Sequence, residues 1–192
     1  RPLTDSECKA MASAFRGKYA FRDAAMFEFG LRTGFRTSEI LSVRVGDVFR
    51  NGHMLPSVTV QKCWMKGGRN SRTMPLHPNA SKALYKWIHE AGFTASEMAD
   101  QPLFCRQHTN KRLTRAQAWA ILKSAARQAG LDVARIAGHS LRKTFAAHMW
   151  QSVHIQGDMA KMARLLGHRN FSNTLRYLEF LDGSLEKAVL ST

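Results

Sequence analysis

Apolar residues recur along most of the chain at the three- and four-residue spacing that marks one face of a helix. Polar residues and glycines separate these stretches. The pattern predicts helices over residues 4–15, 22–34, 78–92, 113–130, 139–153, 158–167 and 170–180, and a short helix from residue 37. One or two further helical turns are expected over residues 184–190.

Capping residues support several of these boundaries. Thr4 with Glu7, and Thr114 with Gln117, have the spacing of a capping box, which predicts helices that begin at Thr4 and Thr114. Gly34 lies where the second helix should end and is a good left-handed C-cap.

One segment departs from helical periodicity. Residues 57–64 are rich in β-branched side chains and partly alternate, which predicts a strand. Residues 65–71 contain two glycines and predict a turn, and residues 72–76 predict the returning strand, with Pro75 at an edge or an end. The expected fold class is therefore α+β, mostly α-helical with a small antiparallel β-sheet, in one domain over residues 1–192.

Composition adds an expectation about partners. The chain has 29 Lys and Arg against 14 Asp and Glu, a net charge of +15. Such an excess on a folded chain indicates a polyanionic partner, most often nucleic acid, although solubility alone is an alternative explanation. There is no apolar run long enough to span a membrane.

The cysteines argue against two classes of site. Cys8, Cys63 and Cys105 are odd in number and widely spaced, so neither a disulfide framework nor a cysteine zinc site is expected. They fit a reducing, cytoplasmic compartment. No His-Glu-x-x-His occurs and the eight histidines are scattered, which argues against a histidine zinc site. We expect no metal and no other cofactor.

Two short segments carry candidate catalytic groups in helical context. His139 and Arg142 are three residues apart and share a helix face, where an imidazole can move a proton and a guanidinium can grip a phosphate. The alternative is a capping histidine and a surface arginine. Arg36 follows Gly34, and Glu39 could orient it or simply form a structural ion pair with it.

Two further candidates lie in less regular context. Lys66 is expected at the tip of the hairpin, where it could protonate a departing alkoxide, and Lys62, Arg69 and Arg72 are its neighbours and rivals. His168 follows a predicted C-cap glycine and precedes Tyr177 by nine residues. Taken singly, His168 could be a cap and Tyr177 a half-buried aromatic.

Together, these segments resemble the catalytic domain of the tyrosine recombinases, the phage-integrase family. The shared features are Arg36 in a Gly-x-Arg-x-x-Glu context, the hairpin lysine Lys66, the His-x-x-Arg of His139 and Arg142, a Leu-Gly-His ending at His168, and Tyr177. They occur in the family's order, and the resemblance covers about residues 3–190. Lys143 stands where the family commonly has histidine, and Asn173 replaces one of two usual threonines.

The resemblance implies a reaction and its residues. Arg36 and Arg142 would hold the nonbridging oxygens of a DNA phosphodiester, and His168 would add a hydrogen bond. Tyr177 would be the nucleophile, with His139 assisting its deprotonation, and Lys66 would protonate the leaving 5′-hydroxyl. The implied function is a site-specific DNA recombinase or integrase that forms a 3′-phosphotyrosine intermediate without ATP or metal.

The resemblance also implies partners and leaves alternatives. The expected partners are double-stranded DNA and other protomers assembled on it, linked by a C-terminal tail over residues 183–192. The family's separate N-terminal DNA-clamping domain is not in the sequence, so we expect a fragment of a longer protein. The alternatives are a type IB topoisomerase and a non-catalytic basic DNA-binding module.

Overall fold

The computed structural model describes residues 1–64, 71–106, 111–155, 157–168 and 171–178, without the side chains of residues 171 and 176–178. The helices are α1 (Asp5–Ala12), α2 (Ala20–Thr33), α3 (Thr37–Ile40), α4 (Pro78–Glu90), α5 (Arg115–Gln128), α6 (Ser140–Gln151), α7 (Met159–Leu166) and α8 (Phe171–Leu178). The strands are β1 (Phe49–Arg50), β2 (His53–Met54), β3 (Ser57–Val60) and β4 (Arg72–Pro75). None of the described helices is both long and apolar enough to cross a bilayer.

The helix ends expected from the capping residues are confirmed, whereas α1 ends earlier and α2 begins earlier than expected. Both capping boxes form, with the hydroxyls of Thr4 and Thr114 accepting from the backbone of Glu7 and Gln117. Gly34 ends α2 in the left-handed conformation, at a φ of 58°. The helical turns expected over residues 184–190 lie outside the described residues.

The antiparallel pairing of the two expected strands is confirmed, but the first strand is shorter than expected, and most of the expected turn lies outside the described residues. Strands β3 and β4 pair antiparallel, with Val58 opposite Met74 and Val60 opposite Arg72. The strand ends at Val60, and residues Lys62–Trp64 form a 3₁₀ turn instead of continuing it. A second antiparallel pair, β1 with β2, was not expected from the sequence.

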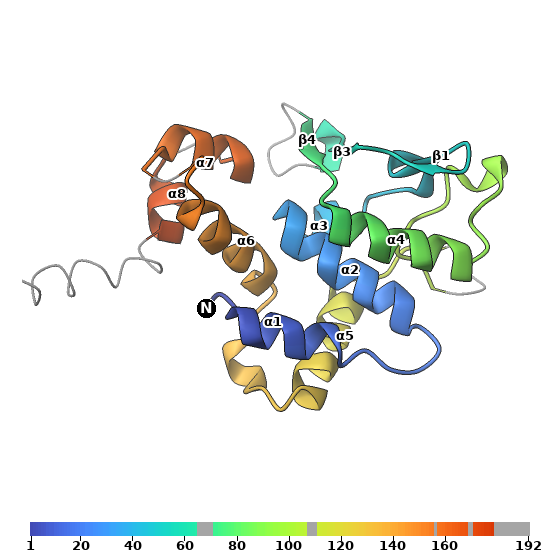
Figure 1. The fold of residues 1–192 in the computed structure, drawn as a ribbon, viewed down its shortest axis with the longest axis horizontal. Coiled ribbons are helices and arrows are strands. Elements are labelled where there is room, and N and C mark those ends of the chain that lie inside the picture. The colour runs from blue at the N-terminus through green and yellow to red at the C-terminus, as the bar shows by residue number, and fades with distance from the viewer. Residues whose placement is uncertain (65–70, 107–110, 156, 169–170, 179–192) are drawn as a thin grey trace, which may run out of the picture.

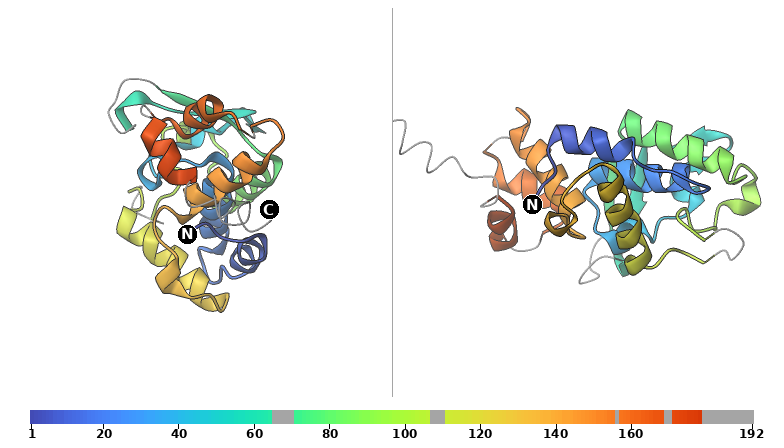
Figure 2. Two further views of the ribbon diagram at one scale, coloured as in Figure 1. Left: turned by 90° about the vertical axis from the view of Figure 1, so that its left-hand side faces the viewer. Right: turned by 90° about the horizontal axis from the view of Figure 1, so that it is seen from below.

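The fold has a central helix, α2, which packs against α4 on one side and α6 on another (Figure 1). The larger core cluster joins α2, the β3–β4 hairpin, α4, α6 and α7, and it contains Phe29, Phe35 and Phe104. A smaller cluster lies between α1, α2 and α5, where α5 contacts both α1 and α3 (Figure 2).

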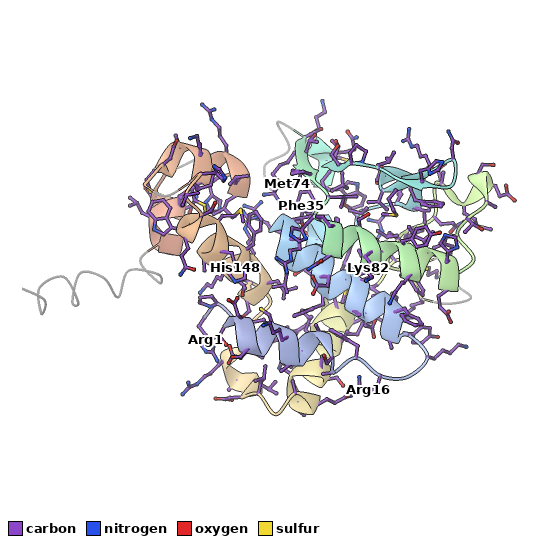
Figure 3. The ribbon with its side chains drawn as sticks, viewed as in Figure 1. Arg1, Arg16, Phe35, Met74, Lys82 and His148 are labelled. Carbon is purple, nitrogen blue, oxygen red and sulfur yellow. The ribbon has the colours of Figure 1, made fainter. Side chains whose placement is uncertain are left out.

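Helices α6, α7 and α8 lie together at one end of the molecule, and α6 connects this group to α2 (Figure 1). The rest of the molecule consists of α1 to α5 and the strands. In Figure 3, Phe35 and Met74 lie at its end that faces helices α6, α7 and α8. The candidate active site occupies the junction between these two parts.

Candidate active site

The turn between α2 and α3 determines the position of Arg36. A Cβ on Gly34 would lie 2.2 Å from the ring of Phe145, and the φ of Gly34 is positive, so only glycine fits this turn without strain. The chain then passes through Phe35 to Arg36, which occupies the N-cap position of α3.

A fully buried carboxylate orients the Arg36 side chain. Glu39 is 0% exposed and accepts two hydrogen bonds from Arg36, one from its backbone N at 2.9 Å and one from its Nη1 at 2.7 Å. The other arginine at this carboxylate is Arg72 of β4, whose Nη2 lies 3.4 Å from Glu39 Oε2. The Arg36–Glu39 ion pair expected from the sequence therefore forms, and it includes a second arginine.

Arg142 is a buried residue, so the alternative of a surface arginine is wrong. Its side chain lies inside the junction and the residue is 2% exposed. Its Nη1 donates to the carbonyl of Gly34 at 2.6 Å, and its Nη2 donates to the carbonyl of Leu166. Because these carbonyls lie at the C-terminal ends of α2 and α7, they carry partial negative charge that favours a cation.

His168 reaches the same region from the end of α7. Helix α7 ends at Gly167, a left-handed C-cap with a φ of 61°, and His168 follows it. The His168 Nδ1 lies 3.0 Å from the hydroxyl of Thr174, a buried residue of α8. Burial, together with Arg142, Arg36 and Arg72, lowers the pKa of His168 to about 4, so its imidazole is neutral at pH 7.

An open cleft of about 750 Å³ adjoins Arg36. His139 also lines it: the residue is exposed at the N-cap position of α6, and its side chain does not cap that helix. Arg36 and His139 thus come together on one cleft, although they are more than a hundred residues apart in sequence. Trp64 and Trp119 form further parts of its wall.

The two tryptophans carry basic neighbours. The guanidinium of Arg112 lies 4.2 Å from the ring centroid of Trp64, which is 42% exposed, and the Lys123 ammonium lies 5.0 Å from that of Trp119. Cations over aromatic faces beside an open cleft suit a ligand with alternating phosphate and apolar groups.

Two of the expected site residues are described only in part or not at all. Lys66 lies outside the described residues. Its neighbour Arg69 and the expected tail over residues 183–192 lie outside them too. Tyr177 belongs to helix α8, but its side chain lies outside the description. Lys62 is exposed in the 3₁₀ turn that follows β3.

Sequence reasoning missed three features of this site. Arg72 is a buried ion-pair partner, and nothing local signals this, because its two partners lie 33 and 93 residues away. Thr174 bonds to His168, and the cleft walls are tryptophans from separate elements. Among the described residues, no group of three or more His, Cys, Asp or Glu side chains could hold a metal ion.

Sequence comparison assigns the chain to a family. It matches the phage integrase family over residues 1–182. The tyrosine recombinase XerC of Herpetosiphon aurantiacus is 34% identical over 161 residues, which cover 84% of this chain and 49% of that protein. The chain therefore spans about half the length of this relative.

Solved structures agree with the fold. The catalytic domain of bacteriophage HP1 integrase matches with a TM-score of 0.62 and 20% identity, over 98% of this chain and 92% of that one. The XerH site-specific recombinase, in a post-cleavage complex with palindromic difH substrate, matches with a TM-score of 0.72 and 22% identity, over 98% of this chain and 52% of that one. The expected fold class is confirmed, and the chain belongs to the phage integrase family, the tyrosine recombinases, with the fold of their catalytic domain.

Proposed function

We propose that residues 1–192 are the catalytic domain of a site-specific DNA recombinase or integrase, which cuts and rejoins strands through a 3′-phosphotyrosine intermediate. The observation that carries this proposal is the convergence of Arg36, Arg142 and His168 at one junction, with a buried carboxylate holding Arg36. The net charge of +15 supports a polyanionic substrate.

The arginines suit the phosphate of a DNA strand. The transition state of phosphodiester cleavage gathers negative charge on the nonbridging oxygens, and guanidinium groups fixed in advance stabilise that charge. Glu39 orients the Arg36 guanidinium, and the carbonyls of Gly34 and Leu166 orient that of Arg142. A guanidinium has five N–H hydrogens, so such contacts do not use all of its donors.

His168 acts as a neutral hydrogen-bond donor to the same phosphate. When the hydroxyl of Thr174 donates to Nδ1, the proton of the neutral ring resides on Nε2 and can be donated to a phosphate oxygen. The low pKa keeps this form at physiological pH.

Tyr177 is the nucleophile. Helix position 177 lies one turn after position 174, and Thr174 contacts His168, which supports this assignment. A tyrosine hydroxyl has a reference pKa of about 10 and needs a base, and His139 on the cleft accepts its proton. The tyrosine oxygen then forms a bond to phosphorus as the bond from phosphorus to the 5′-oxygen breaks.

Lys66 completes the step by protonating the departing 5′-oxygen. The phosphotyrosine retains the energy of the broken ester, so the 5′-hydroxyl of a second strand can attack it, release Tyr177 and rejoin the DNA. One phosphate ester replaces another at each step, and the arginines and the lysine supply positive charge at the phosphate. The reaction therefore needs neither ATP nor a metal ion.

The natural partners are double-stranded DNA and other protomers on that DNA. The solved XerH complex contains a DNA substrate, and the half-buried basic residues Arg112 and Lys123, which lie over the tryptophans of the cleft, suit phosphate contacts that give affinity with little sequence information. Residues 183–192 link neighbouring protomers. The DNA on which the protein acts is cytoplasmic and nucleoid-associated.

Strand transfer tests this function. The protein is incubated, in the presence of a chelator and without ATP, with a cleavable cognate duplex and a labelled strand that has a free 5′-hydroxyl. We expect the label to become covalently joined to the cleaved strand. Relaxation of plasmids without strand transfer would instead indicate a type IB topoisomerase, and binding without any bond cleavage would indicate a non-catalytic DNA-binding module.

A further inference from the structure

Arg72, the first residue of strand β4, makes contacts that bridge the two parts of the molecule. The residue is 7% exposed. Its Nη1 donates to the carbonyl of Leu165 at 2.8 Å, near the end of α7, and its Nη2 faces Glu39 Oε2 at 3.4 Å. Its guanidinium carbon also lies 4.3 Å from the ring centroid of Phe35.

These contacts make Arg72 a member of a connected network. Arg72 and Arg142 donate to consecutive carbonyls, Leu165 and Leu166, immediately before the glycine that precedes His168. The contact with Glu39 lies in the same network, because Glu39 also holds Arg36. The buried Arg72 side chain thus contacts both Glu39, which binds Arg36, and the end of α7, which precedes His168.

We propose that Arg72 is a positioning residue for DNA cleavage, which fixes Arg36 through Glu39 and fixes His168 through the end of helix α7. This inference rests on the proposed function. Arg72 is too buried to be assigned a contact with DNA, so its effect passes through the groups that it holds.

The geometry explains why the Glu39 contact matters. The carboxylate gives Oε1 to the Arg36 side chain, while Oε2 faces Arg72 and the Arg36 backbone. Without Arg72, Oε2 would be available to a second nitrogen of the Arg36 guanidinium, in the forked geometry that arginine and carboxylate favour. Arg36 would then turn toward Glu39 and away from the phosphate.

The charge of Arg72 also acts on His168. Among the described residues, the charged groups that lower the pKa of the imidazole are Arg142 on α6, Arg36 at the start of α3 and Arg72 on β4, and Glu39 pairs with the last two. Each arginine disfavours protonation of His168. Burial and the neighbouring Arg142 lower the pKa of Arg72 itself to about 9, so it remains charged at neutral pH.

Arg22 provides a matched control for a purely structural role. It is 5% exposed, pairs with Asp23 at 2.7 Å, donates to the carbonyl of Cys105 at 3.1 Å and lies over the ring of Tyr19 at 4.4 Å. These contacts parallel those of Arg72, but none of them involves Arg36, Glu39 or the segment before His168. An Arg22→Gln variant therefore reproduces the loss of a buried arginine away from the site.

The test compares Arg72→Gln, Arg72→Lys and Arg22→Gln with the native protein in two measurements. The first is the rate of covalent cleavage of a nicked cognate duplex at saturating protein, corrected for the folded fraction. The second is the pH titration of His168 by NMR, assigned with a His168→Asn variant, which requires no activity. We expect Arg72→Gln to slow cleavage about 100-fold through misplacement of the reacting groups, and to raise the His168 midpoint by about one pH unit.

The other variants separate position from charge. Arg72→Lys should keep the low His168 midpoint, because it keeps the charge, but should still slow cleavage, because lysine lacks the planar fork that reaches both Glu39 and Leu165. Arg22→Gln should change neither quantity. Equal effects of Arg72→Gln and Arg22→Gln overturn the proposal, as does an unchanged His168 midpoint in Arg72→Gln.

Two further outcomes have definite meanings. If Arg72→Gln does not fold, Arg72→Lys decides, and native cleavage by that variant overturns the proposal. If the native protein forms no covalent adduct, the proposed function fails, and the His168 titration alone then decides whether Arg72 acts on the site.

Discussion

Replacing Glu39 with glutamine removes the buried carboxylate that pairs with Arg36 and Arg72. Among the described residues, three guanidinium groups and one carboxylate meet at this junction, and together they carry two positive charges, which the substitution increases to three. Glu39 is 0% exposed and the Arg72 side chain is 8% exposed, so water cannot take the place of the carboxylate at Arg72. Breaking a buried pair in this way costs about 3–5 kcal/mol.

This cost should be measurable as thermal destabilisation. For a domain of this size, 1 kcal/mol lowers Tm by about 2–4 °C, so Glu39→Gln should lower Tm by roughly 6–20 °C. The assay is a circular-dichroism melt with and without sulfate. Sulfate should raise the Tm of Glu39→Gln more than that of the native protein, because an anion that binds Arg36 from the cleft offsets the added positive charge.

Asp100 provides the control. It pairs with Arg44 at 2.9 Å, but its side chain is 90% exposed, and exposed pairs contribute only about 0–1 kcal/mol. Asp100→Asn should therefore melt close to the native protein and respond to sulfate as the native protein does. A Glu39→Gln protein that melts within about 2 °C of native would show that the carboxylate does not compensate the buried arginines, and the electrostatic argument for the site would be wrong.

Three further predictions concern the reaction and the DNA. Lys66→Ala should slow cleavage strongly, and a substrate with a 5′-bridging sulfur, which leaves without a proton, should restore the rate. If this substrate instead restores the rate of Lys62→Ala, Lys62 is the lysine that protonates the leaving group. Thr174→Val should slow cleavage about tenfold by removing the hydrogen bond that orients His168, and a native rate would contradict that role. DNA affinity, measured by fluorescence anisotropy, should fall about a thousandfold between roughly 50 and 200 mM salt, whereas salt-independent binding would exclude a surface dominated by phosphate contacts.

Local chemistry was enough to predict most of the fold. The capping boxes of Thr4 and Thr114 and the left-handed Gly34 fix helix ends through contacts within a few residues, so the sequence displays them directly. The β1–β2 pair also had a local signal, because Asn51-Gly52 is a typical hairpin turn and both residues have positive φ. The strand expected through Trp64 ended at Val60, since a β-favouring composition does not determine where pairing stops.

The candidate site was predictable only in part. The sequence motifs identified Arg36, His139, Arg142 and His168, and the structure places these residues around one junction and its adjoining cleft. The role of Arg72 depends on contacts with distant residues, so no spacing in the sequence could indicate it.

The most direct test of the central claim is whether Tyr177 becomes covalently attached to DNA. A nicked cognate duplex should give a detergent-resistant adduct, and proteolysis with mass spectrometry should locate the phosphate on the peptide that contains Tyr177. Tyr177→Phe should abolish the adduct, whereas Tyr85→Phe, at an exposed tyrosine of α4, should leave it intact. An undiminished adduct in Tyr177→Phe, or a phosphate on another residue, would contradict the account.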